Sequence, residues 1–378
     1  MAEVYQNAHL TIGAVSASDD REGFLNLREG PTWELRVFTS AGNNANIYLR
    51  PQGDTMTLGM QPLDTRAWTL QAQYLSRRQL RFARNKILWR CQQLRQDESD
   101  EPSFNAGGRE WYNINELIKP SEPGDGAYVH YEWYHTVHHY SARKLSIDTD
   151  RFPALAGLAA TVAKHRGNRY CAGMWWEDIA QVISWNVSGW DIDEPARATR
   201  GYVAPSWSWA SIIGRISFPS QGDSEPLQSV KYLDCNLDYM SNNKFGRLER
   251  GWLLLQAPTI SFFRDGTNTL RYGIEFVEDF DQICIKFDLQ GPQPDELFGL
   301  ILMRTTLPWD SKKLSKDSKL LGIMVRRPSE ENTESYYESG RLPDCSNVFQ
   351  RIGYFDVVVT KSQEKQLLGL EAKEVVLI

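Results

Sequence analysis

Four of the six histidines lie in one short stretch of the chain: His130, His135, His138 and His139. If residues 131–145 form a helix, the last three are spaced i, i+3 and i+4 and share one face of it. Imidazoles one helical turn apart can bind a single Zn²⁺ ion. An apolar stripe runs along the same helix at Trp133, Val137 and Tyr140, which places the histidines on the opposite, solvated side. A polar helix surface is therefore the favoured interpretation, and zinc binding by His135, His138 and His139 is a weaker alternative.

The sequence contains no motif for nucleophilic catalysis or phosphate binding. There is no G-x-S-x-G, and the serines and cysteines show no pattern with a histidine. The glycines of residues 105–109 lack the flanking strand and the lysine of a phosphate-binding loop. Carboxylates lie near the expected helix starts, where they favour the positive end of the helix dipole: Asp148, Asp150, Glu177 and Asp178. The sequence therefore predicts no catalytic residue and no cofactor.

Serine and tryptophan alternate at residues 206–211, with Trp207 and Trp209 two positions apart. Alternation of this kind predicts a strand with both tryptophans on one face. Packing in a core is the favoured interpretation, and a stacking platform for the ring of a ligand is the alternative.

The composition is that of a folded protein. The chain has 378 residues, of which 41% are hydrophobic and 24% charged, so we expect two domains or one large domain with an appendage. The net charge of −6 provides no basic field for nucleic acid or anionic lipid. The 13 tryptophans predict a Trp-rich core or interface.

The sequence favours a cytoplasmic location. No apolar run approaches the ~20 residues that span a bilayer, and the first residues lack the features of a signal peptide. The five cysteines are far apart, odd in number and without a C-x-x-C pair: Cys91, Cys171, Cys235, Cys284 and Cys345. This pattern argues against a disulfide framework and a zinc ribbon, and reduced thiols are the simplest interpretation.

Residue patterns predict an α+β fold. Over residues 1–202 we expect a helical region with short strands. Its strands are predicted at 10–15 (buried), 79–82 and 86–91, its helices at 62–75, 131–145, 153–164 and 175–187, and a long polar loop at 92–128. Over residues 203–378 we expect a β-rich sandwich or barrel-like domain. Its clearest strands are predicted at 251–255, 282–287, 320–325 and 354–359.

Several stretches, in order over residues 1 to about 215, resemble the fungal heterokaryon incompatibility (HET) family. They are residues 5–12, residues 62–71 with 75–78 and 89–91, residues 133–145, residues 150–159, residues 170–175, and residues 204–211. The motif positions, interpreted as structural, are Trp68, Gln71, Arg77, Trp89, Cys91, Arg143, Asp150, Arg151, Gly157, Trp175, Pro205, Trp207 and Trp209. The chain is similar to the C-terminal part of such a protein, and its first 202 residues to the end of the HET domain.

The resemblance also has departures. Two early family blocks, Y-x-x-L-S-Y-x-W-G and W-I-D-x-x-C-I-x-Q, are not found; in the family they belong to a TIR-like α/β unit, a class linked to NAD cleavage and cell-death signalling. Ala72 and Arg90 stand where the family usually has glutamate. If either carboxylate served chemistry, this chain has lost it, and arginine reverses the local charge.

The resemblance implies non-self recognition and programmed cell death in a filamentous fungus, by interaction with an unknown protein partner. Trp-rich surfaces are the candidate contacts, and we expect neither nucleic-acid binding nor a membrane span. An NAD-cleaving TIR-like enzyme, inactive in this chain, is the alternative, and a zinc protein is a weaker one. Because the strand at 10–15 lacks upstream partner strands, we also expect an exposed apolar edge and self-association.

Overall fold

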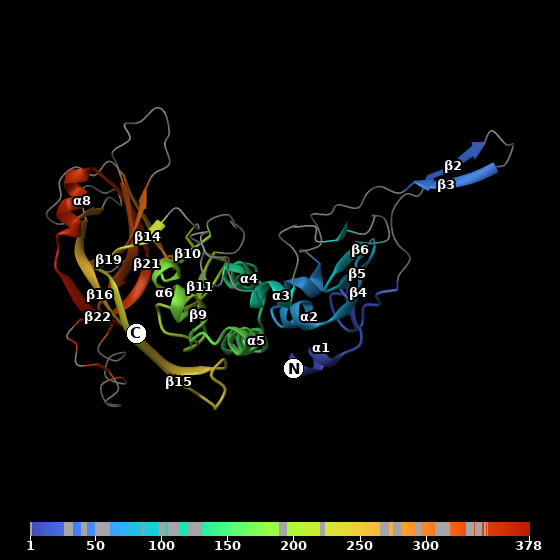
Figure 1. Cartoon of the computed structure of the whole chain (residues 1–378), viewed down its shortest axis with the longest axis horizontal. Coiled ribbons are helices and arrows are strands. Elements are labelled where there is room, and N and C mark those ends of the chain that lie inside the picture. Colours follow the sequence, from blue (N-terminus) through green and yellow to red (C-terminus); the bar gives the residue numbers. More distant parts are fainter. Residues whose placement is uncertain are drawn as a thin grey trace. The chain divides into compact units, whose positions relative to one another are not determined.

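The chain forms two compact units (Figure 1). The computed structural model describes residues 2–25, 33–38, 44–49, 61–84, 86–97, 103–104, 113–119, 131–188, 195–219, 224–264, 272–274, 282–291, 296–306, 318–329, 336, 342–343, 345 and 347–378. Unit 1 comprises residues 1–116 and 143–145, and unit 2 comprises residues 117–142 and 146–378. The α+β class is confirmed, with helices and short strands first and a large sheet after them.

Unit 1 is built on a five-stranded sheet in the order β1-β4-β5-β6-β7. The strands are β1 (Thr11–Ala14), β4 (Arg78–Phe82), β5 (Ile87–Cys91), β6 (Leu94–Asp97) and β7 (Ser103–Phe104). The β1 strand is parallel to β4, whereas the other neighbours are antiparallel. The predicted strands at 79–82 and 86–91 are confirmed as β4 and β5, which form a hairpin. Helices α1 (Ala2–Asn7) and α2 (Thr69–Leu75) lie against each other.

The predicted helix at 62–75 is interrupted. The structure has a 3-10 turn, η2 (Pro62–Thr65), and then α2, with Arg66 extended between them at φ −87° and ψ 129°. Lys144 N–H donates to the Thr65 carbonyl at 2.7 Å, and the Lys144 carbonyl accepts from Ala67 N–H at 3.0 Å. The residue 143–145 segment thus takes the backbone groups that a continuous helix would have paired within itself.

Unit 1 also contains a separate hairpin that the residue patterns did not predict. Strands β2 (Trp33–Phe38) and β3 (Asn44–Leu49) pair antiparallel, with Leu35 opposite Ile47.

In unit 2, the predicted helix at 131–145 is confirmed as α4 (Tyr131–Ser141), and that at 153–164 as α5 (Ala156–Arg166). The predicted helix at 175–187 is wrong in extent, because it contains only η4 (Trp176–Asp178) and α6 (Ile179–Val182). Residues 186–187 instead form β10, which pairs with β13 (Ile216–Ser217). Helix α3 (Ile114–Ile118) begins in unit 1 and ends in unit 2. The remaining short elements of unit 2 outside the large sheet are η3 (Asp148–Asp150), β8 (Tyr170–Cys171), β9 (Met174–Trp175), β11 (Arg197–Ala198), η5 (Trp209–Ser211) and β12 (Ile212–Ile213).

The predicted strand at 206–211 is wrong. A turn leads into η5, and the Ser208 side chain caps it by accepting from Ala210 N–H. Ser208 Oγ also donates to the Ala172 carbonyl at 2.7 Å. Because the serine hydroxyl competes with backbone partners, it favours a turn over a sheet ladder here.

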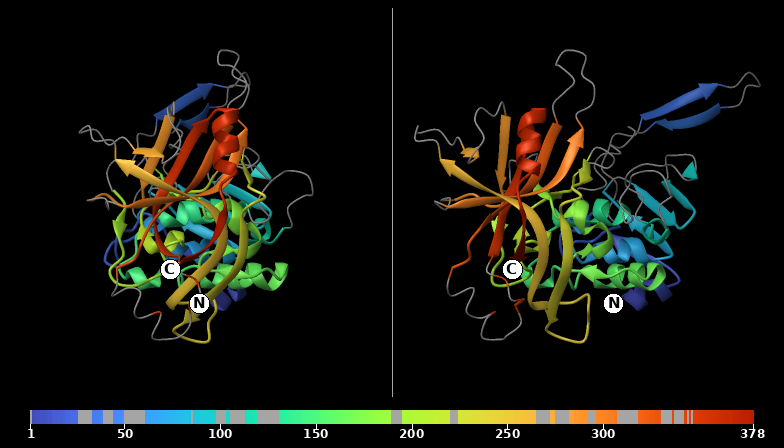
Figure 2. Two further views of the ribbon diagram at one scale, coloured as in Figure 1. Left: turned by 90° about the vertical axis from the view of Figure 1, so that its left-hand side faces the viewer. Right: turned by 60° about the vertical axis from the view of Figure 1, so that its left-hand side comes forward.

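A nine-stranded sheet forms the C-terminal part of unit 2. Its strands are β14 (Ser224–Pro226), β15 (Lys231–Tyr239), β16 (Leu248–Arg264), β17 (Tyr272–Ile274), β18 (Gln282–Phe287), β19 (Leu297–Thr306), β20 (Ser318–Arg326), β21 (Val348–Val359) and β22 (Ala372–Leu377). The long β16 pairs with β22 through Leu253–Pro258 and with β19 through Thr259–Phe262. The path β19-β20-β21-β22-β16 therefore returns to β19, so the sheet closes on itself as a barrel (Figure 2). The predicted β-rich, barrel-like region is confirmed.

The barrel interior is filled by apolar side chains, including Ile301, Met324, Phe355 and Val357, all fully buried. Helix α8 (Lys361–Leu368) contributes Leu367 to the same core. A capping box between Thr360 and Gln363 starts this helix.

The sequence-based domains 1–202 and 203–378 stay a prediction. The compact units divide near residue 116, and the predicted boundary lies within unit 2.

Replacing Gly322 with alanine is expected to destabilise the barrel. A Cβ at this position of β20 would lie 2.0 Å from the Leu300 carbonyl oxygen and 2.6 Å from the Phe355 ring. Overpacking of this kind costs about 1–3 kcal/mol of unfolding free energy, which urea unfolding followed by tryptophan fluorescence would measure. Gly13→Ala is the control, because its Cβ would meet only ordinary contacts at 3.6 Å or more. Equal stability of the two variants would contradict the packing described for β20.

Candidate functional site

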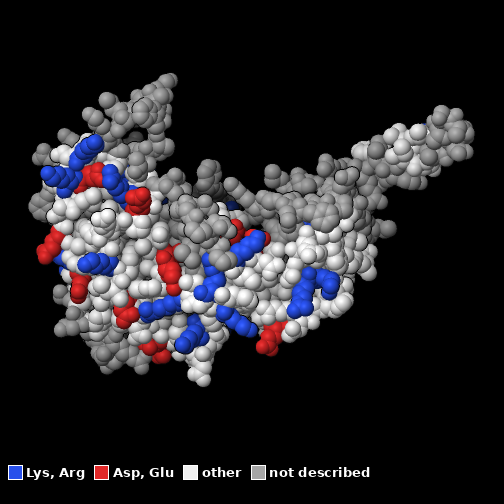
Figure 3. Space-filling view, viewed as in Figure 1, with Lys and Arg blue, Asp and Glu red and all other residues white. Residues whose placement is uncertain are grey.

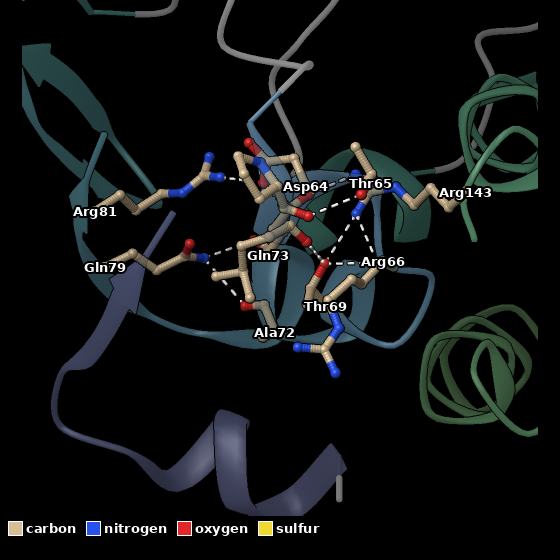
Figure 4. Close-up of polar contacts among 11 residues, drawn as sticks. Asp64, Thr65, Arg66, Thr69, Ala72, Gln73, Gln79, Arg81 and Arg143 are labelled. Atoms are coloured by element: carbon tan, nitrogen blue, oxygen red, sulfur yellow. Dashed lines mark hydrogen bonds and ion pairs between the residues drawn. The ribbon is translucent and has the colours of Figure 1, made fainter. Parts of the chain in front are cut away.

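A buried polar network in unit 1 centres on Asp64 (Figure 4). Asp64 lies in η2, and its Oδ1 accepts hydrogen bonds from Gln73 Nε2 on α2 and from Arg81 Nη2 on β4. The Arg81 contact is also an ion pair, with both side chains under a tenth exposed. Oδ2 of Asp64 is buried and accepts no hydrogen bond from any described residue.

Gln73 connects this ion pair to the 143–145 segment. Its Oε1 accepts from Arg143 Nη2 at 2.9 Å, and Arg143 Nη1 donates to Thr69 Oγ1 at 3.1 Å. Gln79 on β4 donates from Nε2 to the carbonyls of Ala72 and Gln73 at 3.1 and 2.7 Å. The network thus joins η2, α2, β4 and residues 143–145.

The chemistry available to this network is limited. Asp64, Gln73, Gln79, Arg81 and Arg143 are each at most 8% exposed. The one carboxylate accepts hydrogen bonds from Gln73 and from the Arg81 guanidinium. The arrangement fixes the geometry of unit 1 and presents no free nucleophile or base to solvent among the residues described.

The two departures from the family pattern lie on either side of Gln79. The Ala72 carbonyl accepts the Gln79 side-chain hydrogen bond, and Arg90 is the cross-strand partner of Gln79 in the β4–β5 hairpin. Arg90 is 9% exposed. Ala72 and Arg90, which are far apart in the sequence, therefore both lie next to Gln79.

Of the motif residues predicted in unit 1, Arg143 alone belongs to the Asp64 network. Gln71 is buried, Arg77 is exposed, and Trp68, Trp89 and Cys91 are half-buried. Sequence reasoning missed the network residues Asp64, Gln73, Gln79 and Arg81. A signal for the last two was present, because both lie on one face of β4, but a polar face of a strand normally indicates solvent.

The motif residues of unit 2 form a core around Gly173. Trp133 Nε1 and Trp209 Nε1 both donate to the Gly173 carbonyl, at 2.9 and 3.1 Å. Gly173 has φ +91°, and a Cβ there would lie 2.5 Å from the Trp209 ring, so only glycine fits. Trp175 and Trp207 are fully buried as well. Core packing, the favoured interpretation for Trp207 and Trp209, is confirmed.

Arg151 is the charged member of this core. It is 1% exposed, and its guanidinium lies 5.0 Å from the centroid of the Trp209 ring. Burial lowers the pKa of Arg151 to about 10. Nε and Nη2 have no hydrogen-bond partner in the described part of the chain. Among the neighbouring motif positions, Pro205 is buried, whereas Asp150 and Gly157 are half-buried.

The histidine face of α4 is half-buried rather than solvated. His138 Nδ1 lies 2.6 Å from the Ile216 carbonyl, and burial lowers the pKa of this histidine. Nε2 of His135 and Nε2 of His139 are 3.3 Å apart. Within the described ranges, no three His, Cys, Asp or Glu side chains are grouped to hold a metal ion; His130 lies outside those ranges.

An apolar stripe lies on one face of the β2–β3 hairpin. Trp33, Leu35 and Val37 alternate along β2 and are 54%, 48% and 37% exposed, and Ile47, across from Leu35, is 47% exposed. The other face of β2 carries Glu34 and Arg36. The sequence signal was the strict alternation of W-E-L-R-V, which indicates an amphipathic strand.

The β1 strand forms one end of the unit 1 sheet. Among the described strands it pairs only with β4. The prediction that this strand is buried is wrong, since Leu10 and Ile12 are 40% and 60% exposed. An apolar edge is exposed there, as expected.

Positively and negatively charged side chains both occur on the surface of the described residues. On the face shown in Figure 3, Lys and Arg side chains alternate with Asp and Glu. Among the described helices, none has the length and apolar character needed to cross a membrane.

Arg81→Leu is expected to destabilise unit 1 strongly. The change leaves the Asp64 carboxylate buried without its counter-charge, which typically costs about 3–5 kcal/mol. Arg78→Leu on the same strand is the matched control, because Arg78 is exposed. Chemical unfolding of both variants measures the difference, and similar values would show that the ion pair does not stabilise the unit.

Acidic pH is expected to remove the contribution of Asp148 to the stability of the folded chain. Arg197 donates to both carboxylate oxygens of Asp148 at 2.9 and 3.0 Å, and together with Arg200 N–H it lowers the pKa of Asp148 to about 2. Since the folded pKa is below the unfolded value, the stabilisation is present above about pH 4 and is lost as pH falls toward 2.

Asp148→Asn should therefore lower the free energy of unfolding by about 1–2 kcal/mol at pH 7. Solvent screening at the Arg197 side chain, which is 45% exposed, limits the size of this effect. The effect should shrink between pH 4 and 2. Urea unfolding across this pH range measures it, with Asp20→Asn as an exposed control. A cost that does not depend on pH would contradict the assignment.

Comparison with known proteins gives one match. Residues 1–72 match the family model described as heterokaryon incompatibility protein (HET). No curated protein and no solved structure matches the chain significantly. The match lies at the N-terminal end of this chain and includes β1, the β2–β3 hairpin and Asp64, whereas the extension of the domain to residue 202 stays a prediction. Over its first 72 residues, the chain is similar to the heterokaryon incompatibility (HET) family.

Proposed function

We propose that this protein acts in heterokaryon incompatibility through protein interaction, in non-self recognition that leads to programmed cell death in a filamentous fungus. The observation that carries the proposal is the apolar stripe of the β2–β3 hairpin, defined by Trp33, Leu35, Val37 and Ile47. This stripe lies inside the segment that matches the HET family. We expect it to act in the cytoplasm.

An exposed stripe of this kind favours association. A two-stranded hairpin is marginally stable in water by itself, so covering its apolar face stabilises it. The stripe combines an aromatic side chain with three aliphatic ones, which is typical of the centre of a protein interface. Glu34 and Arg36 on the opposite face give the hairpin one apolar side and one charged side, so a partner is expected on the apolar side alone.

A second copy of the chain is the partner that the stripe fits directly. Two such faces are apolar over the same length and carry no charge that pairing would bury. The exposed β1 edge, with Leu10 and Ile12, provides a further surface for the same association.

NAD cleavage is the less favoured function. The Asp64 carboxylate is the buried acid closest to the family motif, and it is already bonded by Gln73 and Arg81. Because the Asp64 side chain is also only 5% exposed, a ribose hydroxyl in solvent would not reach it.

Leu35→Gln is expected to weaken self-association. Removing one buried leucine from an interface costs about 1.5–3 kcal/mol, or roughly 10–100-fold in the dissociation constant. Light scattering coupled to size exclusion, over a range of protein concentrations, measures the change. Arg36→Gln is the matched control, because it introduces the same residue on the opposite face of the same strand.

Two results would count against the proposal. The unaltered chain could remain monomeric at every concentration, or Leu35→Gln and Arg36→Gln could weaken association equally. Release of nicotinamide from NAD by the purified chain, abolished by Asp64→Asn, would support the enzymatic alternative instead.

A further inference from the structure

Two cysteines that are far apart in the sequence meet in unit 2. Cys171 ends strand β8, Cys235 lies in β15, and Arg169, two residues before Cys171, donates to the Cys235 carbonyl, so the two segments lie side by side. The two cysteines are 1% and 5% exposed, and both are unoxidised. Of the five cysteines, the other three are half-buried or exposed.

A cavity lies beside both cysteines. Cys171 and Cys235 line a cavity of about 380 Å³ together with Arg169, Tyr239 and Lys244. This volume exceeds the ~30 Å³ of one water molecule more than tenfold, so it admits part of a small reagent. The arginine and the lysine favour a reagent that carries carboxylates.

Arg169 holds a positive charge beside the pair. Its Nη2 donates to the Cys235 carbonyl and lies 3.3 Å from Asp234 Oδ1. The guanidinium also lies 4.9 Å from the centroid of the Trp176 ring, which restricts its movement. A fixed cation near a thiol favours the thiolate, the form that reacts with disulfides.

The two cysteines differ in their surroundings. The neighbouring Cys171 side chain and burial both raise the pKa of Cys235, against the opposing effect of Arg169. Cys235 is therefore assigned the second step of the exchange, and Cys171 the first.

We propose that Cys171 and Cys235 form a reversible dithiol–disulfide site, oxidised through the cavity by a small anionic disulfide of the glutathione class. The inference goes beyond the proposed function and does not depend on it.

The reaction balances with that disulfide as the oxidant. The Cys171 thiolate attacks one sulfur of the reagent, the reagent's S–S bond breaks, and the first small thiolate leaves and takes a proton. The Cys235 thiolate then attacks the Cys171 sulfur of the mixed disulfide and releases the second small thiol. The protein loses two electrons and two protons, and the reagent gains both as two thiols.

The proposed disulfide would join two defined elements of the fold. Cys171 precedes a tight turn in which Ala172 has φ +45° and Gly173 φ +91°, and two tryptophan side chains hold the Gly173 carbonyl. Cys235 lies on β15, an end strand of the nine-stranded sheet with a register shift between Tyr232 and Asp234. A disulfide would therefore fasten an irregular end strand to a rigid turn.

The test is exposure of the folded chain to oxidised glutathione. Free thiols are then blocked with N-ethylmaleimide in denaturant, and the digested protein is examined by mass spectrometry. We expect a cross-linked peptide containing Cys171 and Cys235, lower by two hydrogens or about 2 Da, that disappears on treatment with reduced glutathione. Exposed Cys284 should carry separate glutathione adducts and serves as an internal control for the reagent.

Three variants sharpen the test. Cys171→Ser should abolish the cross-link, Cys345→Ser should leave it unchanged, and Arg169→Gln should slow its formation severalfold without slowing modification of Cys284. Circular dichroism confirms that each variant is folded. The proposal is overturned if Cys171 and Cys235 are both alkylated, or carry separate adducts, under conditions that modify Cys284. It is also overturned if the cross-link forms only in the denatured chain.

Discussion

The buried ion pair between Asp64 and Arg81 determines how unit 1 is organised. A charge removed from water needs a counter-charge and hydrogen bonds, so η2, α2 and β4 must approach closely enough to provide them. As a result, the inward face of β4 carries Gln79 and Arg81. Large apolar side chains, such as Ile12 and Leu35, are meanwhile left exposed. Unit 1 thus combines an apolar core, which includes Leu70 and Leu75, with a buried polar network and with apolar side chains that remain exposed.

Unit 2 has the opposite organisation. Its tryptophans lie inside, and the Gly173 carbonyl is a common acceptor for two of them. The same turn fixes the position of Cys171. This one turn therefore requires a glycine at position 173 and also places Cys171 near Cys235. The closed sheet then provides a stable support for β15 and Cys235.

The sequence predicted the regular elements well where one periodicity dominated. The strands β16, β18, β20 and β21 and helices α4 and α5 follow from runs of apolar residues at the expected spacing. It failed where a distant segment competed for local hydrogen bonds. Lys144 interrupts the helix at 62–75, pairing of β10 with β13 shortens the helix at 175–187, and Ser208 turns the chain where a strand was predicted.

The candidate sites were less predictable, since they depend on contacts between distant residues. Arg143 was recognised as a motif position, but its partners Gln73 and Thr69 are on another segment. The pairing of Cys171 with Cys235 has no local signal at all. The β2–β3 stripe is different, because its alternation is plain in the sequence and could have been found.

Hydrogen–deuterium exchange of the purified chain at low and high protein concentration would show whether the HET-matched segment associates through the β2–β3 stripe. We expect the amides of residues 33–38 and 44–49 to exchange more slowly at high concentration, while those of the barrel strands are unchanged. Exchange of the hairpin amides that is independent of concentration, in a chain whose other amides remain protected, would contradict it.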